Sequence, residues 1–220
     1  MQKNITWSLI AALAFMFVIF SPKIDQFLAL ASYNELTRVF YGEEALWCKI
    51  IYKAVPVITV VLILLPLVWL FKSRHDKKKI KQVTKFGLMV YLSLALGPGL
   101  VVNVLLKDHW GRPRPYQVLR DNEQYSPFWV PHFSNNRDNS FPGGHASIGF
   151  FLGIPLLALG RKKSAVIVSL GGGVLVGSVR ILQGGHYFSD VIFSGIFVWL
   201  IAWFVIHSVA KLNWGVTLSE

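Results

Sequence analysis

Six apolar stretches, separated by polar residues, divide this chain. They cover residues 5–20, 55–71, 86–106, 146–160, 164–182 and 191–209. A membrane-spanning helix needs about 20 predominantly apolar residues, within a range of about 17–25. The chain of 220 residues is 54% hydrophobic and only 15% charged, whereas soluble domains average about 45–50% apolar and about 25% charged residues. The sequence therefore predicts an all-α integral membrane bundle of six transmembrane helices, formed by a single domain that comprises residues 1–220.

Two of these stretches leave an alternative open. The fourth, 146–160, is short and contains a proline, so it could be a re-entrant or buried segment. The first is expected to end at Ser21 and Pro22, and it could be a cleaved signal peptide, because residues 29–31 have the small-x-small form of a cleavage site. That site lies far beyond the apolar run, so we expect an uncleaved anchor.

Lysine and arginine are distributed unevenly over the connections. The short connections 72–85 and 161–163 are the most basic, and cytoplasmic loops carry the excess of Lys and Arg. The even-numbered connections and both termini are therefore expected to face the cytoplasm. The basic run also suits anionic lipid headgroups, so we read the net charge of +11 as a sign of a bilayer partner and expect no nucleic acid. Protein partners are not predicted.

Polar residues gather in two connections that this topology places on the outer side. They are, in chain order, Lys107, Arg114, Gly143, Gly144, His145, Arg180, His186 and Asp190. Ionisable groups are costly at a membrane boundary and by default mark a functional site. Because both connections face the same side, we expect these side chains to meet.

The cations and glycines of this set are typical of a phosphate site. Arginine matches the oxygen spacing of phosphate with paired donors, and the glycines lead into a helix whose first N–H groups attract anions. A metal site formed by His145, His186 and Asp190 is the alternative. The three flanking cations would repel a metal ion and attract an oxyanion, so no metal and no cofactor are expected.

The histidines suit proton transfer and nucleophilic attack near neutral pH. Asp190 follows His186 by four residues, which is one helical turn on the same face. A carboxylate at that place could accept the proton of one ring nitrogen and leave the other nitrogen to attack.

This arrangement resembles the three-part signature of the type 2 phosphatidic acid phosphatase superfamily. The matching blocks are Lys107-x6-Arg114-Pro115, Phe141-Pro142-Gly143-Gly144-His145 and Arg180-x5-His186-x3-Asp190, within a core of about 86–205. The resemblance implies a bundle of six helices and metal-independent hydrolysis through a phosphohistidine. It implies that His186 is the nucleophile, that Asp190 orients it, and that His145 protonates the leaving oxygen and then helps water attack. The implied phosphate ligands are Lys107, Arg114, Arg180, Gly143 and Gly144.

Two positions depart from the family pattern. Gly143 and Val179 stand where the family usually has serine, and Ser178 lies one position earlier than expected. We expect adjusted phosphate contacts and retained activity.

The stretches 109–112 and 183–190 look like those of bacterial lipid A phosphatases, which remove the 1- or 4′-phosphate on the periplasmic face. The resemblance implies an inner-membrane enzyme with its active site facing the periplasm and lipid A as substrate. Undecaprenyl diphosphate, phosphatidylglycerol phosphate and phosphatidic acid are the alternative substrates, and phosphate transfer to another lipid is an alternative reaction. A transporter or a non-catalytic scaffold is the alternative of another class, but a transporter would hold its charges near mid-membrane, often within repeats.

Three further features have no catalytic interpretation. The loop 116–140 is rich in aromatic residues and reads as an interfacial aromatic belt, with a lid as the alternative. Glycines at 171–173 and 177 predict close helix packing. Cys48 is the one cysteine, which excludes an intramolecular disulfide.

Overall fold

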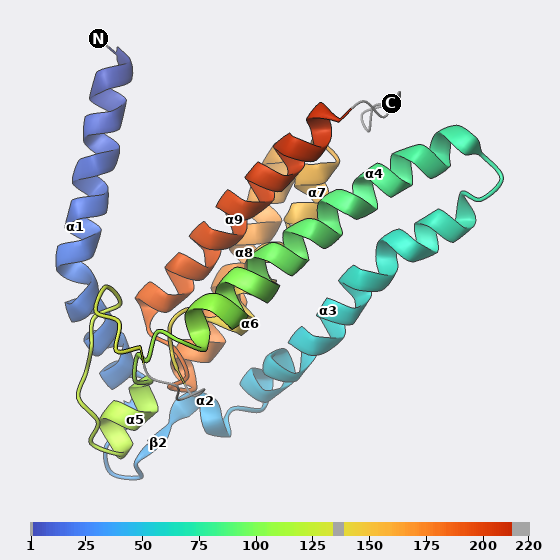
Figure 1. Ribbon diagram of the computed structural model, residues 1–220. Coiled ribbons are helices and arrows are strands. Elements are labelled where there is room, and N and C mark those ends of the chain that lie inside the picture. Colours follow the sequence, from blue (N-terminus) through green and yellow to red (C-terminus); the bar gives the residue numbers. More distant parts are fainter. Residues whose placement is uncertain (1, 134–138, 213–220) are drawn as a thin grey trace.

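The computed structural model describes residues 2–133 and 139–212, which form a bundle of long helices with one short hairpin (Figure 1). The helices are α1 (Gln2–Ala31), α2 (Tyr41–Glu44), α3 (Leu46–Lys72), α4 (Lys77–Leu94), η1 (Ala95–Lys107), α5 (Pro115–Arg120), α6 (Gly144–Phe151), α7 (Ile154–Ala158), α8 (Lys162–Leu182) and α9 (Phe188–Lys211). The strands β1 (Tyr33–Asn34) and β2 (Val39–Phe40) pair antiparallel, with Tyr33 opposite Phe40. The predicted all-α class is confirmed.

Four helical stretches within the described residues are long and apolar enough to cross a bilayer. They are Leu46–Lys72, Lys77–Lys107, Lys162–Leu182 and Phe188–Lys211. Large apolar side chains stay exposed along them, for example Leu64, Ile167 and Leu200, and so extensive an apolar surface is suited to lipid rather than water. The six-span count stays a prediction, with α1 and the α6–α7 segment as its remaining members.

The third predicted segment is one continuous helix that changes its winding halfway. The Asp76 carboxylate accepts hydrogen bonds from the N–H groups of Lys78 and Lys79, at 2.9 and 3.1 Å, and so caps the start of α4. From Ala95 the helix continues as η1, a stretch of wider π-type turns. Such turns are frequent at functional sites, and η1 ends at Lys107, the first of the predicted site residues.

The predicted end of the first helix at Ser21 and Pro22 is wrong. Helix α1 continues through Pro22 to Ala31. A proline removes one backbone hydrogen bond of the helix, and the turn beyond it is held by tertiary contacts instead. Asp25 is buried there and accepts a hydrogen bond from the N–H of Ser189 at 2.8 Å.

The fourth segment is short, as its sequence indicated, and it is buried at the centre of the bundle. It breaks into α6 and α7 around Leu152 and Gly153. Close packing against α8 holds it, because a Cβ atom on Gly149 would lie 2.5 Å from the carbonyl oxygen of Gly172. Gly173 and Gly177 also meet neighbouring side chains directly, which confirms the predicted glycine packing at these positions.

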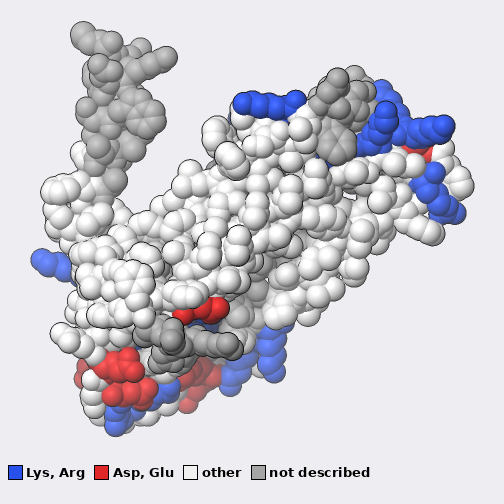
Figure 2. Space-filling view, in the orientation of Figure 1, with Lys and Arg blue, Asp and Glu red and all other residues white. Residues whose placement is uncertain are grey.

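The two ends of the bundle differ in charge. Lys and Arg side chains gather around the turn between α3 and α4, whereas both signs mix at the opposite end, near α2 and α5 (Figure 2). The first residues of α6, the last of α8 and the first of α9 lie at this second end (Figure 1). The motif-bearing connections therefore lie together, far from the most basic turn of the chain.

Candidate active site

The predicted site residues come from elements that converge at this mixed-charge end. The N–H of Tyr116, after the first motif, donates to the carbonyl oxygen of Gly184, within the third, at 3.1 Å. The N–H of Ser140, before the second motif, donates to the carbonyl oxygen of Arg112 at 2.8 Å. These backbone bonds join all three motifs, so the structure brings together the segments that the spacing grouped.

His186 lies in the turn between α8 and α9, and only 1% of its surface is exposed. Its Nδ1 atom lies 2.5 Å from the carbonyl oxygen of Ser140, whereas the nearer Asp190 oxygen is 3.8 Å away. A carbonyl oxygen can only accept, so Nδ1 carries the proton and Nε2 carries the lone pair. The predicted partner of the ring, Asp190, is thus a neighbour of His186, but Ser140 is its hydrogen-bond acceptor.

The surroundings of His186 keep its ring neutral. Burial lowers the pKa of His186 to about 3, and the charges of Arg180 and Arg114 act in the same direction. Asp190 opposes them through its hydrogen-bonding and charge interactions, which raise the pKa without reversing the shift. A neutral imidazole is the form that can act as a nucleophile.

His145 stands in the first turn of α6, on the other side of the glycine pair. Its ring stacks on the ring of Tyr52 from α3, with centroids 4.4 Å apart and planes 14° apart. The guanidinium of Arg180 lies 4.8 Å from the same Tyr52 ring. The charges of Arg180, Lys107 and Arg114 all act on His145, so the three predicted cations surround one histidine.

The two glycines make backbone and packing contacts at the start of α6. The N–H of Gly143, expected to bind phosphate, donates to the hydroxyl of Ser194 at 2.8 Å. That hydroxyl in turn donates to the carbonyl oxygens of Asp190 and Gly143, so it couples the two segments. Gly144 begins α6, where a Cβ atom would overlap the side chain of Asn103. Gly144 is thus required for close packing at the entrance of α6.

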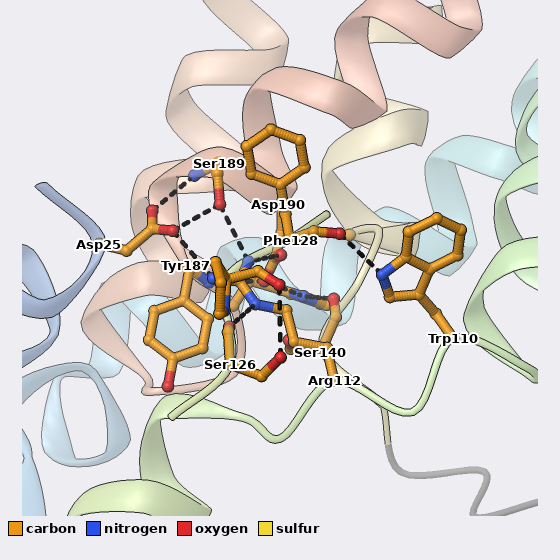
Figure 3. A network of polar contacts seen from close by, with 12 residues as sticks. Asp25, Trp110, Arg112, Ser126, Phe128, Ser140, Tyr187, Ser189 and Asp190 are labelled. Carbon is orange, nitrogen blue, oxygen red and sulfur yellow. Dashed lines mark hydrogen bonds and ion pairs between the residues drawn. The ribbon is translucent and has the colours of Figure 1, made fainter. Parts of the chain in front are cut away.

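The structure adds a residue that sequence reasoning missed, Arg112. It is fully buried beneath the site, and its guanidinium sits between two carboxylates from distant parts of the chain (Figure 3). It donates to oxygens of Asp25, Ser126, Ser189 and Asp190. The bonds to Asp25 and Ser189 are both 2.9 Å long, and the guanidinium also lies 4.3 Å from the ring centre of Tyr187.

This network ties α1 to the helix that carries Asp190. Burial alone would lower the pKa of Arg112, but the charges of Asp190 and Asp25 outweigh it and leave the pKa raised. The sequence feature that could have indicated this network is Asp25, an acid just beyond an apolar stretch. Spacing could not identify Arg112 as its partner, because 87 residues separate Asp25 from Arg112. The second carboxylate oxygen of Asp190 accepts from the N–H of Tyr187 at 2.7 Å.

The described residues contain no group of three or more His, Cys, Asp or Glu side chains arranged to hold a metal ion. The histidines and Asp190, considered above as an alternative metal site, therefore do not form such a group. They contact a backbone carbonyl, an aromatic ring and an arginine instead.

Comparisons with known proteins identify the family of the chain and several similar proteins. Residues 82–214 fit the model of the PAP2 superfamily. The chain is 36% identical to the lipid A 4′-phosphatase of Francisella tularensis subsp. novicida, over 87% of this chain and 89% of that protein. It is 34% identical to the lipid A 4′-phosphatase of Rhizobium leguminosarum, over 46% of this chain and 45% of that protein. It is 31% identical to the lipid A 1-phosphatase of Rhizobium johnstonii, over 56% and 48%. No solved structure matches the chain.

Proposed function

Because this chain belongs to the PAP2 superfamily, we propose that it is a membrane phosphatase that removes a phosphate group from lipid A. The observation that carries this proposal is the match to the Francisella lipid A 4′-phosphatase. That match covers 87% of the chain, and so extends beyond residues 82–214, which the family model covers. The 4′-phosphate is accordingly the position that we propose is attacked.

In the first step, Nε2 of His186 attacks the phosphorus atom and the bond from phosphorus to the sugar oxygen breaks. The electron pair of that bond goes to the sugar oxygen, which takes a proton from His145, in the imidazolium form that the bound phosphate anion stabilises against the neighbouring cations. The Nδ1 contact with Ser140, at 2.5 Å, supports this role of His186, because it leaves the lone pair on Nε2. The product of the step is a phosphohistidine and a free sugar hydroxyl.

In the second step, water replaces His186 on phosphorus. His145, now neutral, takes a proton from water, the resulting hydroxyl bonds to phosphorus, and the phosphorus–Nε2 bond returns its electron pair to the ring. Inorganic phosphate leaves and both histidines regain their starting forms. Lys107, Arg114 and Arg180 stabilise the charge on the phosphate oxygens in both transition states.

The proposed location is a bacterial inner membrane with both termini in the cytoplasm and the site facing the periplasm. The distance of the site from the basic α3–α4 turn supports this orientation, because cytoplasmic loops carry the excess of Lys and Arg.

The test is phosphate release by the purified full-length protein in detergent with EDTA. The substrates are lipid A, undecaprenyl diphosphate, phosphatidylglycerol phosphate and phosphatidic acid. His186→Ala is the inactivating variant, and His207→Ala is its matched control, because His207 stacks on Trp203 in α9, outside the catalytic set. We expect release from lipid A that His186→Ala abolishes and His207→Ala preserves. No release from lipid A by the folded wild-type protein would overturn the proposal.

A further inference from the structure

A polar pocket of about 230 Å³ opens beside the phosphate-binding residues. Its lining includes Glu43, Tyr52, Tyr116, Arg120, Arg180 and Gln183. Arg180 belongs both to this pocket and to the cations around His145. A group bound in the pocket would therefore lie next to a phosphate held by Arg180.

The pocket combines aromatic faces with hydrogen-bonding groups of both kinds. Arg120 lies 3.5 Å from a carboxylate oxygen of Glu43 and 5.1 Å from the ring centre of Tyr116. Gln183 accepts a hydrogen bond from Arg180 at 2.6 Å, which fixes the amide at the pocket wall. Arg120 and Glu43 keep about a third of their surfaces exposed, 36% and 34%, so a ligand can reach both.

Glycine packing holds the acidic wall in place. A Cβ atom on Gly42 would lie 2.6 Å from the backbone carbon of Leu182, so a larger residue could not approach α8 this closely. The neighbouring Glu43 is thereby held beside the end of α8, where Arg180 and Gln183 stand. Glu43 also accepts from the N–H of Phe40 at 3.3 Å, which fixes its carboxylate.

The walls of the pocket come from two parts of the chain. Glu43 and Tyr52 precede the segment shared with the whole superfamily, which begins at residue 82, whereas Arg180 and Gln183 lie within it. The superfamily segment supplies Arg180, which can bind the phosphate that all substrates carry. Glu43 and Tyr52 come from outside that segment, so they are suited to distinguish one phosphorylated substrate from another.

We propose that this pocket binds the sugar ring that carries the scissile phosphate, with Arg120 and Glu43 as specificity-determining residues. The inference rests on the proposed function. Tyr52 and Tyr116 add aromatic walls against which the ring can pack, while the carboxylate and the guanidinium match the hydroxyl and amide groups of a glucosamine unit. The volume is below the range of about 300–1,000 Å³ typical for whole small ligands, and suits a single ring. Glycerol lipids present no such ring.

The test measures binding and turnover separately. Binding is measured by calorimetry in the full-length His186→Ala protein, which cannot turn the ligand over, with inorganic phosphate and a glucosamine phosphorylated on its 4-hydroxyl as probes. Arg120→Gln and Glu43→Gln are introduced singly. Asp121→Asn is the matched control, because Asp121 lies 3.8 Å from Arg120 but does not line the pocket.

We expect the sugar phosphate to bind at least about tenfold more tightly than phosphate, since tenfold corresponds to about 1.4 kcal/mol, the scale of one or two good polar contacts. Arg120→Gln and Glu43→Gln should remove most of this preference, and Asp121→Asn should keep it. Equal binding of the two probes, or equal behaviour of the three variants, would overturn the pocket proposal. Turnover of lipid A by the wild-type protein decides the proposed function independently, because the binding experiment needs no catalysis.

Discussion

Nδ1 of His186 points at the carbonyl oxygen of Ser140, 2.5 Å away, and not at Asp190, four residues along the chain. A backbone carbonyl thus fixes the tautomer of the ring, and it does so from the segment that leads into the glycine pair. The carboxylate of Asp190 is shared between Arg112 and the N–H of Tyr187. Asp190 therefore acts on His186 as a neighbour, through hydrogen-bonding and charge interactions that raise the pKa of the ring, and it holds the first turn of α9 through the N–H of Tyr187.

Replacement of Asp190 by asparagine should reduce kcat less than replacement of His186 by alanine. Where a carboxylate alone fixes the tautomer of a catalytic histidine, the asparagine variant loses about 10⁴-fold in kcat. Here Ser140 keeps the proton on Nδ1, so we expect Asp190→Asn to lose about 10–100-fold in kcat, the scale of a displaced supporting group. Steady-state phosphate release compares it with His186→Ala. Equal inactivation of both variants would show that Asp190 holds the tautomer.

The buried, neutral His186 should make the protein less stable in acid. Its folded pKa of about 3 lies below the ordinary value of about 6.5, so the unfolded chain binds the additional proton. The stabilisation is fully present above about pH 6.5 and is lost as the pH falls toward 3, at up to about 1.4 kcal/mol per pH unit. Thermal unfolding in detergent between pH 7 and pH 4 measures it. His186→Asn should flatten this dependence, and an unchanged slope would contradict the pKa shift.

Removal of the buried arginine should destabilise the fold strongly. Arg112→Gln leaves Asp25 and Asp190 without their common cation, and loss of one partner from a buried ion pair costs about 3–5 kcal/mol. Adding Asp25→Asn removes one of the stranded charges, so the double variant should recover about 1–3 kcal/mol. Equilibrium unfolding of both single variants and the double variant completes the cycle. Strict additivity would mean that the two side chains are not coupled.

Local sequence patterns predicted the helices and the grouping of the motifs, but they did not predict the contacts between residues far apart in the chain. The hydropathy pattern predicted the long helices, because it depends on residues near in sequence. The same pattern, with the charges of the connections, placed the segments of Ser140 and His186 on one side, although 46 residues separate the two. The role of Asp25 depends on Arg112, which lies 87 residues away, and no pattern within one segment reports such a pairing. The partner of the Gly143 N–H, Ser194, was missed for the same reason.

Two glycines on one helix should respond oppositely to alanine. Nothing lies within 4 Å of a Cβ atom added to Gly171, whereas one added to Gly173 would overlap the buried ring of Phe150. Gly171→Ala should raise stability by about 0.5–1 kcal/mol, because alanine favours the helix. Gly173→Ala should lower it by about 1–3 kcal/mol through overpacking. Thermal unfolding of the two proteins side by side tests both, and a shared sign would refute the packing described.

The ring of Tyr52, on which the His145 ring stacks, should contribute to kcat, whereas the Tyr52 hydroxyl should not. Tyr52→Ala removes the surface on which the His145 ring lies, 4.4 Å from centroid to centroid, and we expect about a tenfold loss of kcat, the scale of a misplaced catalytic group. Tyr52→Phe keeps that surface and should stay within about twofold, since the ring contact is retained. Phosphate release from lipid A at saturating concentrations gives kcat, which measures this effect apart from any change in substrate binding. Similar losses in both variants would assign the effect to the hydroxyl.

The bond between Arg112 and Asp25 also sets a limit on how this chain can be divided. A fragment cut at the boundary of the shared segment, 82–214, would inherit Arg112 with only one of its two counter-charges. It would also lack the aromatic support of His145 from α3. The family segment thus depends on the N-terminal region for part of its buried contacts. A chimera with a foreign N-terminal region would need an acid at the position of Asp25 to restore the charge balance around Arg112.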